Sequence, residues 1–591
     1  MEQITENDRS KLTRRLAPLY ILLVIFLLLV LGRMFYLQLE LGQEFERLSA
    51  VNRIRHEKIP SSRGKIVDRA GRVLAADQPV FQLVKEPGEE RLDGVRVRRL
   101  AELLKVDPNE LAGRLSDPDR RFILRDISDE QKIRFEENSA QFPGLKIDVF
   151  PRRVYEYGEV IGPVVGYTGE ISSQELVSRR GEGLAQGDIV GKRGVESAYD
   201  RYLRGEDGIQ WIETTAAGEY IRTLESPSPI APQPGNDLQL NLDLELQEEI
   251  KKTFAADSEG AVVVMEIPSG RVRSLFVQPA YDPNKFVRGQ QQEIRQLFLE
   301  EDDPLVNRAV HSRFPPASSF KLVPFMVALE NNFDPATTFD CPGYYELGRE
   351  EFGCWREEGH GQLNLYRALV HSCNVYFYNL AAELQIEAIV ELSEKINYSG
   401  RAGIDIPGER PAQLSTPQLL SERYGFSWTE GELLNTVIGQ GYTLISPIKQ
   451  AQVLARLLTG RHVIPRLVGE VENEATGIPA KENREQLLST MDEVASSGTG
   501  YWAQHTEDYQ PIGPDVAGKT GTVQKVRLDD EEDTPDADAW FVSAAPANSP
   551  EYVVVVYLSE AGSAGQTAAP KARDVYLKME ELGYFEGGRE E

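Results

Sequence analysis

Basic residues are in short supply in this sequence. Its 591 residues include 65 lysines and arginines against 93 acidic residues, which gives a net charge of −28. No basic stripe offsets that charge, so we expect no nucleic-acid partner. Internal repeats and low-complexity tracts are lacking as well. Together with 41% hydrophobic residues, this favours about three or four ordinary folded domains over a repeat architecture.

Long apolar runs are scarce too, because only residues 16–32 form a long stretch without charge. Apolar residues continue to Leu39, so we predict one transmembrane helix over residues 16–39. Four basic residues precede it, which predicts a cytoplasmic tail over residues 1–15 and places the rest of the chain outside. A cleaved signal peptide is the alternative, but no small-x-small cleavage site follows the run.

Two folded regions are expected after the anchor. Residues 40–235 mix short β-type runs, such as Phe81 to Val84, with charged helical stretches, and we call this α+β region the pedestal. A proline- and serine-rich join at residues 226–235 ends it. We therefore predict a second domain over residues 236–580 and a polar tail over 581–591.

One stretch of the second domain suggests a nucleophile. Pro315 and Pro316 stop regular structure before an apolar helix that begins near Ser318 and runs to Glu330. Free N–H groups at a helix N-terminus stabilise a developing anion, so Ser318 is a candidate nucleophile. Lys321, beside apolar residues one turn on, would be partly desolvated, which lowers its pKa and lets it accept the serine proton. A capping serine followed by an exposed lysine is the alternative.

Two further motifs favour the catalytic interpretation. They are Ser372-Cys373-Asn374 and Lys519-Thr520-Gly521-Thr522. Both follow Ser318 in the order typical of penicillin-binding proteins and serine β-lactamases. Three short motifs in that order are far less expected by chance than any one of them alone. The sequence therefore predicts an acyl-enzyme site.

The resemblance extends along nearly the whole chain. Residues 63–75 and 191–208 resemble pedestal motifs of class B penicillin-binding proteins, and residues 343–361 resemble an insert of the elongation-type members. Two residues depart from the family pattern: Ala317 stands where glycine often precedes the nucleophile, and Asp538 where histidine is more usual. The fold implied is α/β multidomain: a transmembrane helix, an extended α+β pedestal of the dimerisation type, and a transpeptidase domain with an antiparallel sheet flanked by helices, as in serine β-lactamases.

A peptidoglycan D,D-transpeptidase is the activity that the resemblance implies. Ser318 would attack the penultimate D-Ala of a stem pentapeptide and expel the terminal D-Ala, and an amine of a neighbouring stem would then resolve the acyl-enzyme. Lys321 would act as the general base. The remaining roles are a proton route through Ser372 and Lys519, a substrate amide contact by Asn374, an oxyanion hole from the N–H groups of Ser318 and Thr522, and a grip on the substrate carboxylate by Thr520 and Thr522 beside Gly521.

Substrate, partners and location follow from the same resemblance. Stem peptides on a lipid-linked precursor glycan would be the substrate, and β-lactam antibiotics would acylate the enzyme. A membrane glycan polymerase of the SEDS family (RodA-like) and the cell-elongation machinery would be its partners. The enzyme would be a single-pass protein of the bacterial inner (cytoplasmic) membrane, with its catalytic domain in the periplasm or outside.

Other proteins with the same motifs remain as alternatives: a β-lactam receptor, a β-lactamase or a catalytically silent scaffold. A receptor would carry further spans and an intracellular effector domain, and a silent scaffold would lack motif residues. A β-lactamase needs a base that lets water deacylate the enzyme. The spacing between Glu430 and Asn435 is one residue too long for the class A pattern, so we interpret Glu430 and Glu432 as structural.

All three cysteines fall within residues 341–373, together with His360. The pattern is C-x12-C-x5-H-x12-C, and it offers a Cys3His ligand set for one structural zinc ion: Cys341, Cys354, His360 and Cys373. Outside the membrane, one disulfide with a free thiol is an alternative, as are unlinked core cysteines. The odd number of cysteines favours the metal. No organic cofactor is expected.

Charged residues of the pedestal motifs also have a plain structural interpretation. Asp68-Arg69, between two glycines, fits a hairpin with a surface ion pair. Glu196 fits a solvated charge on a helix. Both interpretations place these carboxylates in solvent.

Overall fold

The computed structural model describes residues 6–40, 54–85, 92–116, 122–214, 220–255, 258–506, 508, 510–523 and 537–585. The start of the predicted cytoplasmic tail and the end of the predicted polar tail lie outside these residues. The chain forms two compact units whose segments alternate along the sequence. Unit 1 comprises Met1–Ser61, Pro79–Pro151 and Glu206–Gln233, and unit 2 comprises Ser62–Gln78, Arg152–Gly205 and Pro234–Glu591.

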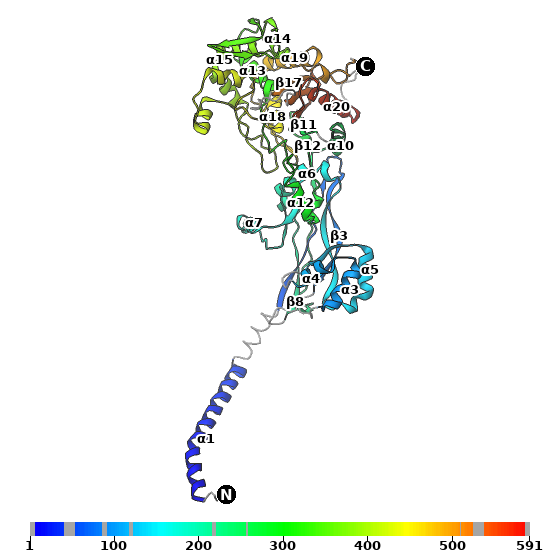
Figure 1. The fold of residues 1–591 in the computed structure, drawn as a ribbon, viewed down its shortest axis with the longest axis vertical. Coiled ribbons are helices and arrows are strands. Elements are labelled where there is room, and N and C mark those ends of the chain that lie inside the picture. Colours follow the sequence, from blue (N-terminus) through cyan, green and yellow to red (C-terminus); the bar gives the residue numbers. More distant parts are fainter. Residues whose placement is uncertain are drawn as a thin grey trace. The chain divides into compact units, whose positions relative to one another are not determined.

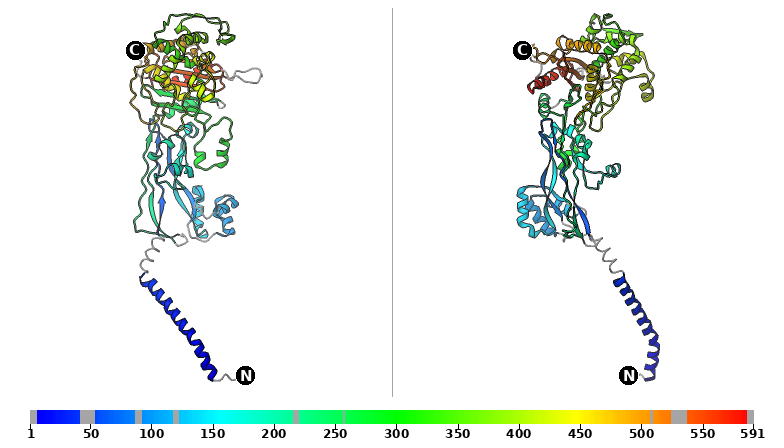
Figure 2. Two further views of the ribbon diagram at one scale, coloured as in Figure 1. Left: turned by 90° about the vertical axis from the view of Figure 1, so that its left-hand side faces the viewer. Right: turned by 180° about the vertical axis from the view of Figure 1, so that it is seen from behind.

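The N-terminal helix α1 (Glu6–Phe35) is continuous and passes into a π-helical turn, η1 (Tyr36–Glu40) (Figure 2). Its segment Ala17–Gln38 is long and apolar enough to cross a membrane, and its side chains are almost all exposed. No other helix among the described residues has this length and composition. A long exposed apolar helix is stable in lipid and not in water, so α1 suits a single-pass membrane anchor.

Unit 1 contains a small antiparallel sheet and an α/β cluster with its own core. The sheet has the strand order β1-β8-β9. In the cluster, three helices pack around buried Leu100, Leu104 and Phe135. The elements of unit 1 are β1 (Ile54–Ile59), α3 (Gly94–Leu104), α4 (Pro108–Ser116), β4 (Phe122–Ile127), α5 (Asp129–Asn138), η2 (Ser139–Gln141), β8 (Gly208–Thr214) and β9 (Tyr220–Thr223), with parts of the long strands β3 (Val73–Lys85) and β5 (Leu145–Tyr155).

Unit 2 is built on a five-stranded antiparallel sheet of order β12-β11-β19-β18-β17 (Figure 1). Helices α10 and α20 cover one face and α18 covers the other, so both faces are buried, which explains the nearly continuous apolar sequence of β19. The elements are α10 (Leu244–Thr253), β11 (Gly260–Glu266), β12 (Val272–Gln278), α18 (Pro447–Thr459), β17 (Ala517–Val523), β18 (Asp538–Ala545), β19 (Tyr552–Leu558) and α20 (Ala568–Glu581).

The predicted motifs lie on further helices and short strands of unit 2. These elements are η4 (Ala317–Lys321), α13 (Leu322–Glu330), β13 (Phe339–Cys341), β14 (Tyr344–Leu347), β15 (Glu350–Gly353), β16 (Gly361–Leu363), α14 (Leu365–Val370), α15 (Asn374–Lys395), α16 (Pro417–Leu419), η5 (Leu420–Tyr424), α17 (Glu430–Val437), α19 (Lys481–Ser497) and η6 (Tyr501–Ala503). Helix α13 is buried on almost every side, which places the turn before it deep in the domain.

Short elements of the pedestal, and three more within residues 238–297, complete unit 2. They are β2 (Ile66–Val67), η3 (Gly158–Val160), α6 (Gly162–Val165), β6 (Thr168–Glu170), α7 (Ser173–Ser178), β7 (Ile189–Gly191), α8 (Gly194–Ala198), α9 (Asp200–Leu203), β10 (Leu238–Gln239), α11 (Asn284–Val287) and α12 (Gln291–Leu297). A hairpin and charge pairs hold the pedestal elements. Strands β2 and β3 form the expected hairpin, and β10 joins β2 in parallel.

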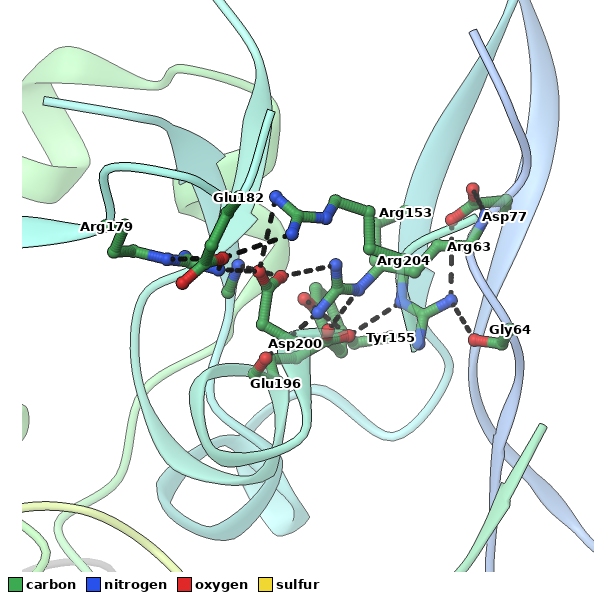
Figure 3. A network of polar contacts seen from close by, with 11 residues as sticks. Arg63, Gly64, Asp77, Arg153, Tyr155, Arg179, Glu182, Glu196, Asp200 and Arg204 are labelled. Carbon is green, nitrogen blue, oxygen red and sulfur yellow. Dashed lines mark hydrogen bonds and ion pairs between the residues drawn. The ribbon is translucent and has the colours of Figure 1, made fainter. Parts of the chain in front are cut away.

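A buried ion-pair network ties these segments together (Figure 3). We call it the pedestal network: Arg63, Arg153, Arg179 and Arg204 facing Asp77, Glu182, Glu196 and Asp200. Glu196 receives Arg63 Nε at 2.6 Å and Arg153 Nε at 2.7 Å, and Asp200 receives Arg63 Nη1 at 2.7 Å. Four positive charges therefore meet four carboxylates, and the central residues Arg63, Arg153, Glu196 and Asp200 are buried.

The structure corrects the two expectations of solvated carboxylates. Glu196 is 0% exposed, because α8 turns it inward against two arginines. Asp68 is also 0% exposed, and it pairs with Arg72 (2.7 Å) and not with its neighbour Arg69, which reaches Asp243 at 3.1 Å. Its Oδ1 accepts the N–H groups of residues 70 and 72, so the carboxylate closes the hairpin turn.

Candidate active site

Ser318 lies in η4, a single 3-10 turn, and the α-helix α13 begins only at Leu322. The prediction of a turn that opens a helix is confirmed, but the helix starts four residues late. Ala317 explains the delay because its φ of +48° is left-handed and interrupts a regular start. Two bonds from distant segments hold the turn: Ala317 N donates to Gly439 O (3.0 Å) and Trp540 Nε1 donates to Pro315 O (2.9 Å).

Lys321 is 0% exposed, so it is more deeply buried than the partial desolvation that the sequence predicts. Burial lowers its pKa from 10.5 to about 8. Its Nζ contacts Asn374 Oδ1 (2.6 Å), Ser372 O (2.8 Å) and Ser372 Oγ (3.4 Å). Among the described residues, the Lys321 amine therefore bonds to Ser372 and Asn374 of the second motif, and it forms no hydrogen bond with Ser318. Catalytic hydrogen bonds often form only when substrate binds, and η4 keeps the two side chains one turn apart.

Lys519 contacts the same hydroxyl of Ser372. Its Nζ donates to Ser372 Oγ (2.9 Å) and to Thr520 O (3.0 Å). The side chain is 0% exposed, and burial followed by the nearby charge of Lys321 holds its pKa well below the ordinary value. Ser372 therefore bridges two amines that cannot both keep a proton easily, which is the arrangement expected of a proton route.

Ser372 and Asn374 are placed by the turn between α14 and α15. Ser372 has a φ of +53°, an uncommon conformation for a residue other than glycine, and Asn374 is the first residue of α15. The turn is held open because Cys373 Sγ accepts the N–H of Tyr376 (3.5 Å) and caps the helix. The Asn374 side chain has two partners. Its Oδ1 accepts a hydrogen bond from Lys321 Nζ, and its Nδ2 donates to Gly353 O (3.2 Å).

The third motif lies on β17, the edge strand of the sheet, beside η4. A Cβ on Gly521 would come within 2.8 Å of Pro316 O and 3.2 Å of Ser319 N, so only glycine allows this close approach. The approach brings the backbone of Thr522 to the turn of Ser318. An edge strand also has backbone groups outside the sheet ladder, which a peptide or an oxyanion can use.

Sequence reasoning missed Thr499. Its Oγ1 lies 2.7 Å from Oγ1 of Thr520, and Thr522 Oγ1 accepts the N–H of Ala564 (3.2 Å). Thr499 follows the end of α19 in the run Ser-Gly-Thr-Gly, and the turn glycines in this run were the only signal that could have found it. The Thr520 hydroxyl, one of the two that we assigned to the substrate carboxylate, is therefore oriented by Thr499.

Cys341, Cys354, His360 and Cys373 come together from three segments: β13, the loop between β15 and β16, and the residue before α15. Their ligand atoms all lie within 4.8 Å of one another, and His360 Nδ1 is 3.5 Å from the sulfurs of both Cys341 and Cys354. A tetrahedral zinc would hold its donors about 3.5 to 3.8 Å apart, so the set fits that ion. A hydrogen bond between the two thiols lowers the pKa of Cys354 and raises the pKa of Cys373, so Cys354 is the first of this pair to form a thiolate.

Glu430 and Glu432, the residues considered for a β-lactamase, lie in the first turn of α17. Negative charge in the first turn interacts favourably with the helix dipole, and Thr429 caps the same turn by accepting the N–H of Glu432 (3.3 Å). Their placement agrees with the structural interpretation.

Comparisons with known proteins agree with this geometry. The penicillin binding protein transpeptidase domain matches residues 260–577, and the penicillin-binding protein dimerisation domain matches residues 58–240. Peptidoglycan D,D-transpeptidase MrdA of Acinetobacter baumannii is 31% identical over 586 residues, which cover 94% of this chain and 86% of that protein.

Two solved structures extend the match to three dimensions. Penicillin-binding protein PBP2 in its complex with MreC from Helicobacter pylori is 26% identical, covers 90% of this chain and 99% of its own, and has a TM-score of 0.79. A chain of a peptidoglycan synthase complex that coordinates polymerization and crosslinking is 26% identical, covers 96% and 98%, and has a TM-score of 0.68. The chain therefore belongs to the penicillin-binding proteins and is a serine-type peptidoglycan D,D-transpeptidase of the kind that serves cell elongation.

Proposed function

We propose that this transpeptidase uses Ser318 as its nucleophile and Lys321 as its general base. The observation that supports the assignment is the convergence of both lysines on Ser372 Oγ, next to the turn that carries Ser318. Lys321 accepts the proton of Ser318 as its Oγ attacks the penultimate D-Ala carbonyl. Ser372 and Lys519 then carry that proton to the amine of the leaving D-Ala.

The oxyanion and the substrate ends are assigned to backbone and hydroxyl groups. The N–H groups of Ser318 and Thr522 stabilise the tetrahedral oxyanion, since Gly521 brings β17 against η4. Asn374 holds the substrate amide. Thr520 and Thr522 bind the terminal carboxylate, and Lys519 adds positive charge beside them.

A fluorescent penicillin tests the nucleophile in the full-length protein. The wild type should be labelled covalently and lose the label slowly, since a transpeptidase does not deacylate efficiently with water. Ser318→Ala should abolish labelling, while Ser421→Ala, a change of an exposed serine on η5, should not alter it. Labelling of Ser318→Ala at the wild-type rate would refute the assignment, and rapid loss of the label would favour a β-lactamase.

The membrane anchor supports a proposal about topology. We place residues 1–15 in the cytoplasm and unit 2 in the periplasm or outside, because basic residues precede the apolar segment Ala17–Gln38. Protease added from outside should cut the protein beyond the anchor and spare an N-terminal tag. Protection of unit 2 in intact cells would contradict this orientation.

The two solved relatives support a proposal about partners. One is bound to MreC, and the other belongs to a complex described as coordinating polymerization with crosslinking. We assign this enzyme a SEDS-family glycan polymerase in the same membrane and scaffold proteins of the elongation machinery. Gentle membrane purification should recover the polymerase with the wild type, and replacing residues 16–39 by an unrelated span should weaken recovery. Recovery of the wild type alone would count against the partnership.

We also propose that the protein binds one structural zinc ion. Four protein ligands, Cys341, Cys354, His360 and Cys373, would leave no open position, so the metal would activate no water. Cys373 lies between Ser372 and Asn374, and fixing its sulfur would fix both neighbours. The ligands come from β13, the loop between β15 and β16 and the residue before α15, so the ion would also tie three segments together.

Metal analysis tests the zinc directly. Protein purified without chelator should contain close to one zinc per chain and no disulfide by thiol titration. Cys354→Ser should lower the melting temperature first and the rate of penicillin labelling second, because the catalytic residues are displaced and not removed. Metal-free protein with a disulfide between two of these cysteines would refute the site.

A further inference from the structure

The hairpin of β14 and β15 borders the active site through Gly353. Its carbonyl accepts Nδ2 of Asn374 (3.2 Å), the amide assigned to the substrate. In the antiparallel ladder Gly353 pairs with Tyr344, and a Cβ built on Gly353 would meet open space. The surface immediately beyond Asn374 is therefore open, and glycine keeps it flat.

Two exposed aromatic rings flank this open position. Tyr344 is 42% exposed and Trp355 is 58% exposed. Cys354 N donates to Gly343 O (2.7 Å), so the ladder continues beyond β15. Trp355 lies in the bend after β15, and Gly353, Cys354 and Trp355 are exposed, buried and exposed in turn, so Trp355 lies on the exposed side of the chain, as do Gly353 and its ladder partner Tyr344. We call these three exposed residues, two of which carry aromatic rings, the strip.

Trp355 is fixed in position although it is exposed. Its Nε1 donates to His371 O (3.0 Å), one residue before Ser372, and its ring meets His360 edge-on with centroids 5.4 Å apart. A ring held by its polar edge leaves a face in solvent without conformational freedom. A preorganised aromatic face of this kind binds a flat apolar surface at low entropic cost.

Charges on the same hairpin select among the parts of peptidoglycan. Glu346, Glu350 and Glu351 are exposed there with only Arg349 to balance them. This excess of negative charge disfavours the carboxylate-bearing stem peptide. A pyranose ring carries no charge. Its C–H groups pack against aromatic rings, and its hydroxyl groups donate hydrogen bonds to carboxylates.

We propose that Tyr344, Gly353 and Trp355 form a saccharide platform that binds a pyranose ring of the glycan strand while the stem peptide occupies the acylation site. The inference rests on the transpeptidase activity and names a further part of the same substrate. Four stem residues separate the sugar from the acylated carbonyl and span up to about 14 Å. The strip begins one hydrogen bond beyond Asn374, on the path that such a stem would follow.

Two matched probes test the platform in the full-length enzyme: a stem pentapeptide, and the same peptide carrying its N-acetylmuramyl sugar and the adjoining N-acetylglucosamine. The measurement is the concentration of each that halves the rate of fluorescent penicillin labelling. The wild type should need about tenfold less of the sugar-bearing peptide. Trp355→Ala and Tyr344→Ala should each remove most of that preference without changing protection by the bare peptide or labelling by penicillin alone.

Control variants separate a sugar contact from a structural effect. Trp355→Phe keeps an aromatic face and should retain part of the preference, and Phe298→Ala, which removes a ring that is 63% exposed outside the hairpin, should retain all of it. Zinc content is measured for the Trp355 variants because Cys354 is adjacent. If they lose metal or misfold, Tyr344→Ala decides the question. A wild type without sugar preference, or equal losses for both probes, would overturn the platform. Neither result depends on whether Ser318→Ala loses labelling.

Discussion

The pedestal network and the active site both contain buried cations, and the two regions treat them in opposite ways. In the pedestal network, Arg63 and Arg153 are nearly inaccessible and face Glu196 and Asp200 at 2.6 to 2.7 Å. In the active site, Lys321 and Lys519 are equally buried, yet among the described residues neither forms an ion pair with a carboxylate.

The two regions differ in how the surroundings of each cation shift its pKa. Carboxylates offset the desolvation of the arginines, and their attraction raises the pKa of Arg63 although burial alone would lower it. The two lysines bond to hydroxyl, amide and carbonyl groups. Cys373 and Cys354 attract the Lys321 amine, but burial outweighs this attraction and lowers the pKa of both lysines. Balanced charges make the network a structural element, and unbalanced charges make the lysines able to take and give protons.

Removing Lys321 should break the catalytic side of the comparison most strongly. We expect Lys321→Ala to lower the second-order rate of penicillin labelling about 10³-fold, because a general base contributes 10²- to 10⁴-fold. The variant should remain folded, since no ion pair is lost. Stopped-flow labelling and circular dichroism measure the two quantities. A variant that keeps near wild-type labelling would show that another group deprotonates Ser318.

Removing Glu196 should break the structural side. Glu196→Ala leaves Arg63 and Arg153 buried without this partner, and we expect the free energy of unfolding to fall by about 3–5 kcal/mol. Urea unfolding measures the loss, and penicillin labelling of the folded fraction should be unchanged. Glu391→Ala, which removes a surface ion pair with Lys395, is the control and should leave the urea midpoint unchanged. Equal midpoints for the two variants would mean that burial does not matter here.

Changing the pH should sharpen the comparison further. Lys321 must be neutral to act as a base, so labelling should rise about tenfold per unit toward its pKa of about 8 and level off above it. The unfolded chain keeps this proton up to 10.5, so the free energy of unfolding should also rise between about pH 8 and 10.5. A flat labelling profile between pH 6 and 9 would exclude Lys321 as the base.

The pedestal network should respond only in acid. Burial would raise the pKa of Asp200, but attraction by Arg63 and a hydrogen bond from Arg179 outweigh it and hold the pKa below 3.8. A carboxylate with a depressed pKa contributes stability above its unfolded value and loses it as the pH falls through the folded value. Melting temperatures measured from pH 7 down to 3 should therefore separate the two regions, and Asp200→Asn should remove part of the acid-dependent loss.

The smallest expected effect concerns Thr499. Thr499→Val removes the hydroxyl partner of Thr520, and we expect a roughly threefold to tenfold slower labelling, expressed mainly in weaker binding of penicillin. Thr490→Val is the matched control, because it removes a hydroxyl of α19 that bonds Gln486 O at 2.7 Å away from the motif. In combination with Thr520→Val, the Thr499 change should add little. Full additivity would show that the two hydroxyls act separately.

Local sequence was sufficient for the chemistry and for the anchor. The spacing of Ser318 and Lys321 is read within one turn, and the motifs at Ser372 and Lys519 are each contiguous, so their residue types and order predict the family and the activity. The span of residues 16–39 depends only on the length and composition of one segment. The fold class follows from the same resemblance, and the structure confirms it.

Only the tertiary structure determined which charged side chains are buried and which groups they contact. Arg63 and Glu196 are 133 residues apart, and Lys519 and Ser372 are 147 apart, so neither pairing has a local signature. For this reason Glu196 was expected in solvent, and Thr499 was not noticed at all. Desolvation and electrostatic attraction act through space, and only the packing of distant segments determines whether a buried cation finds a carboxylate or must give up its proton.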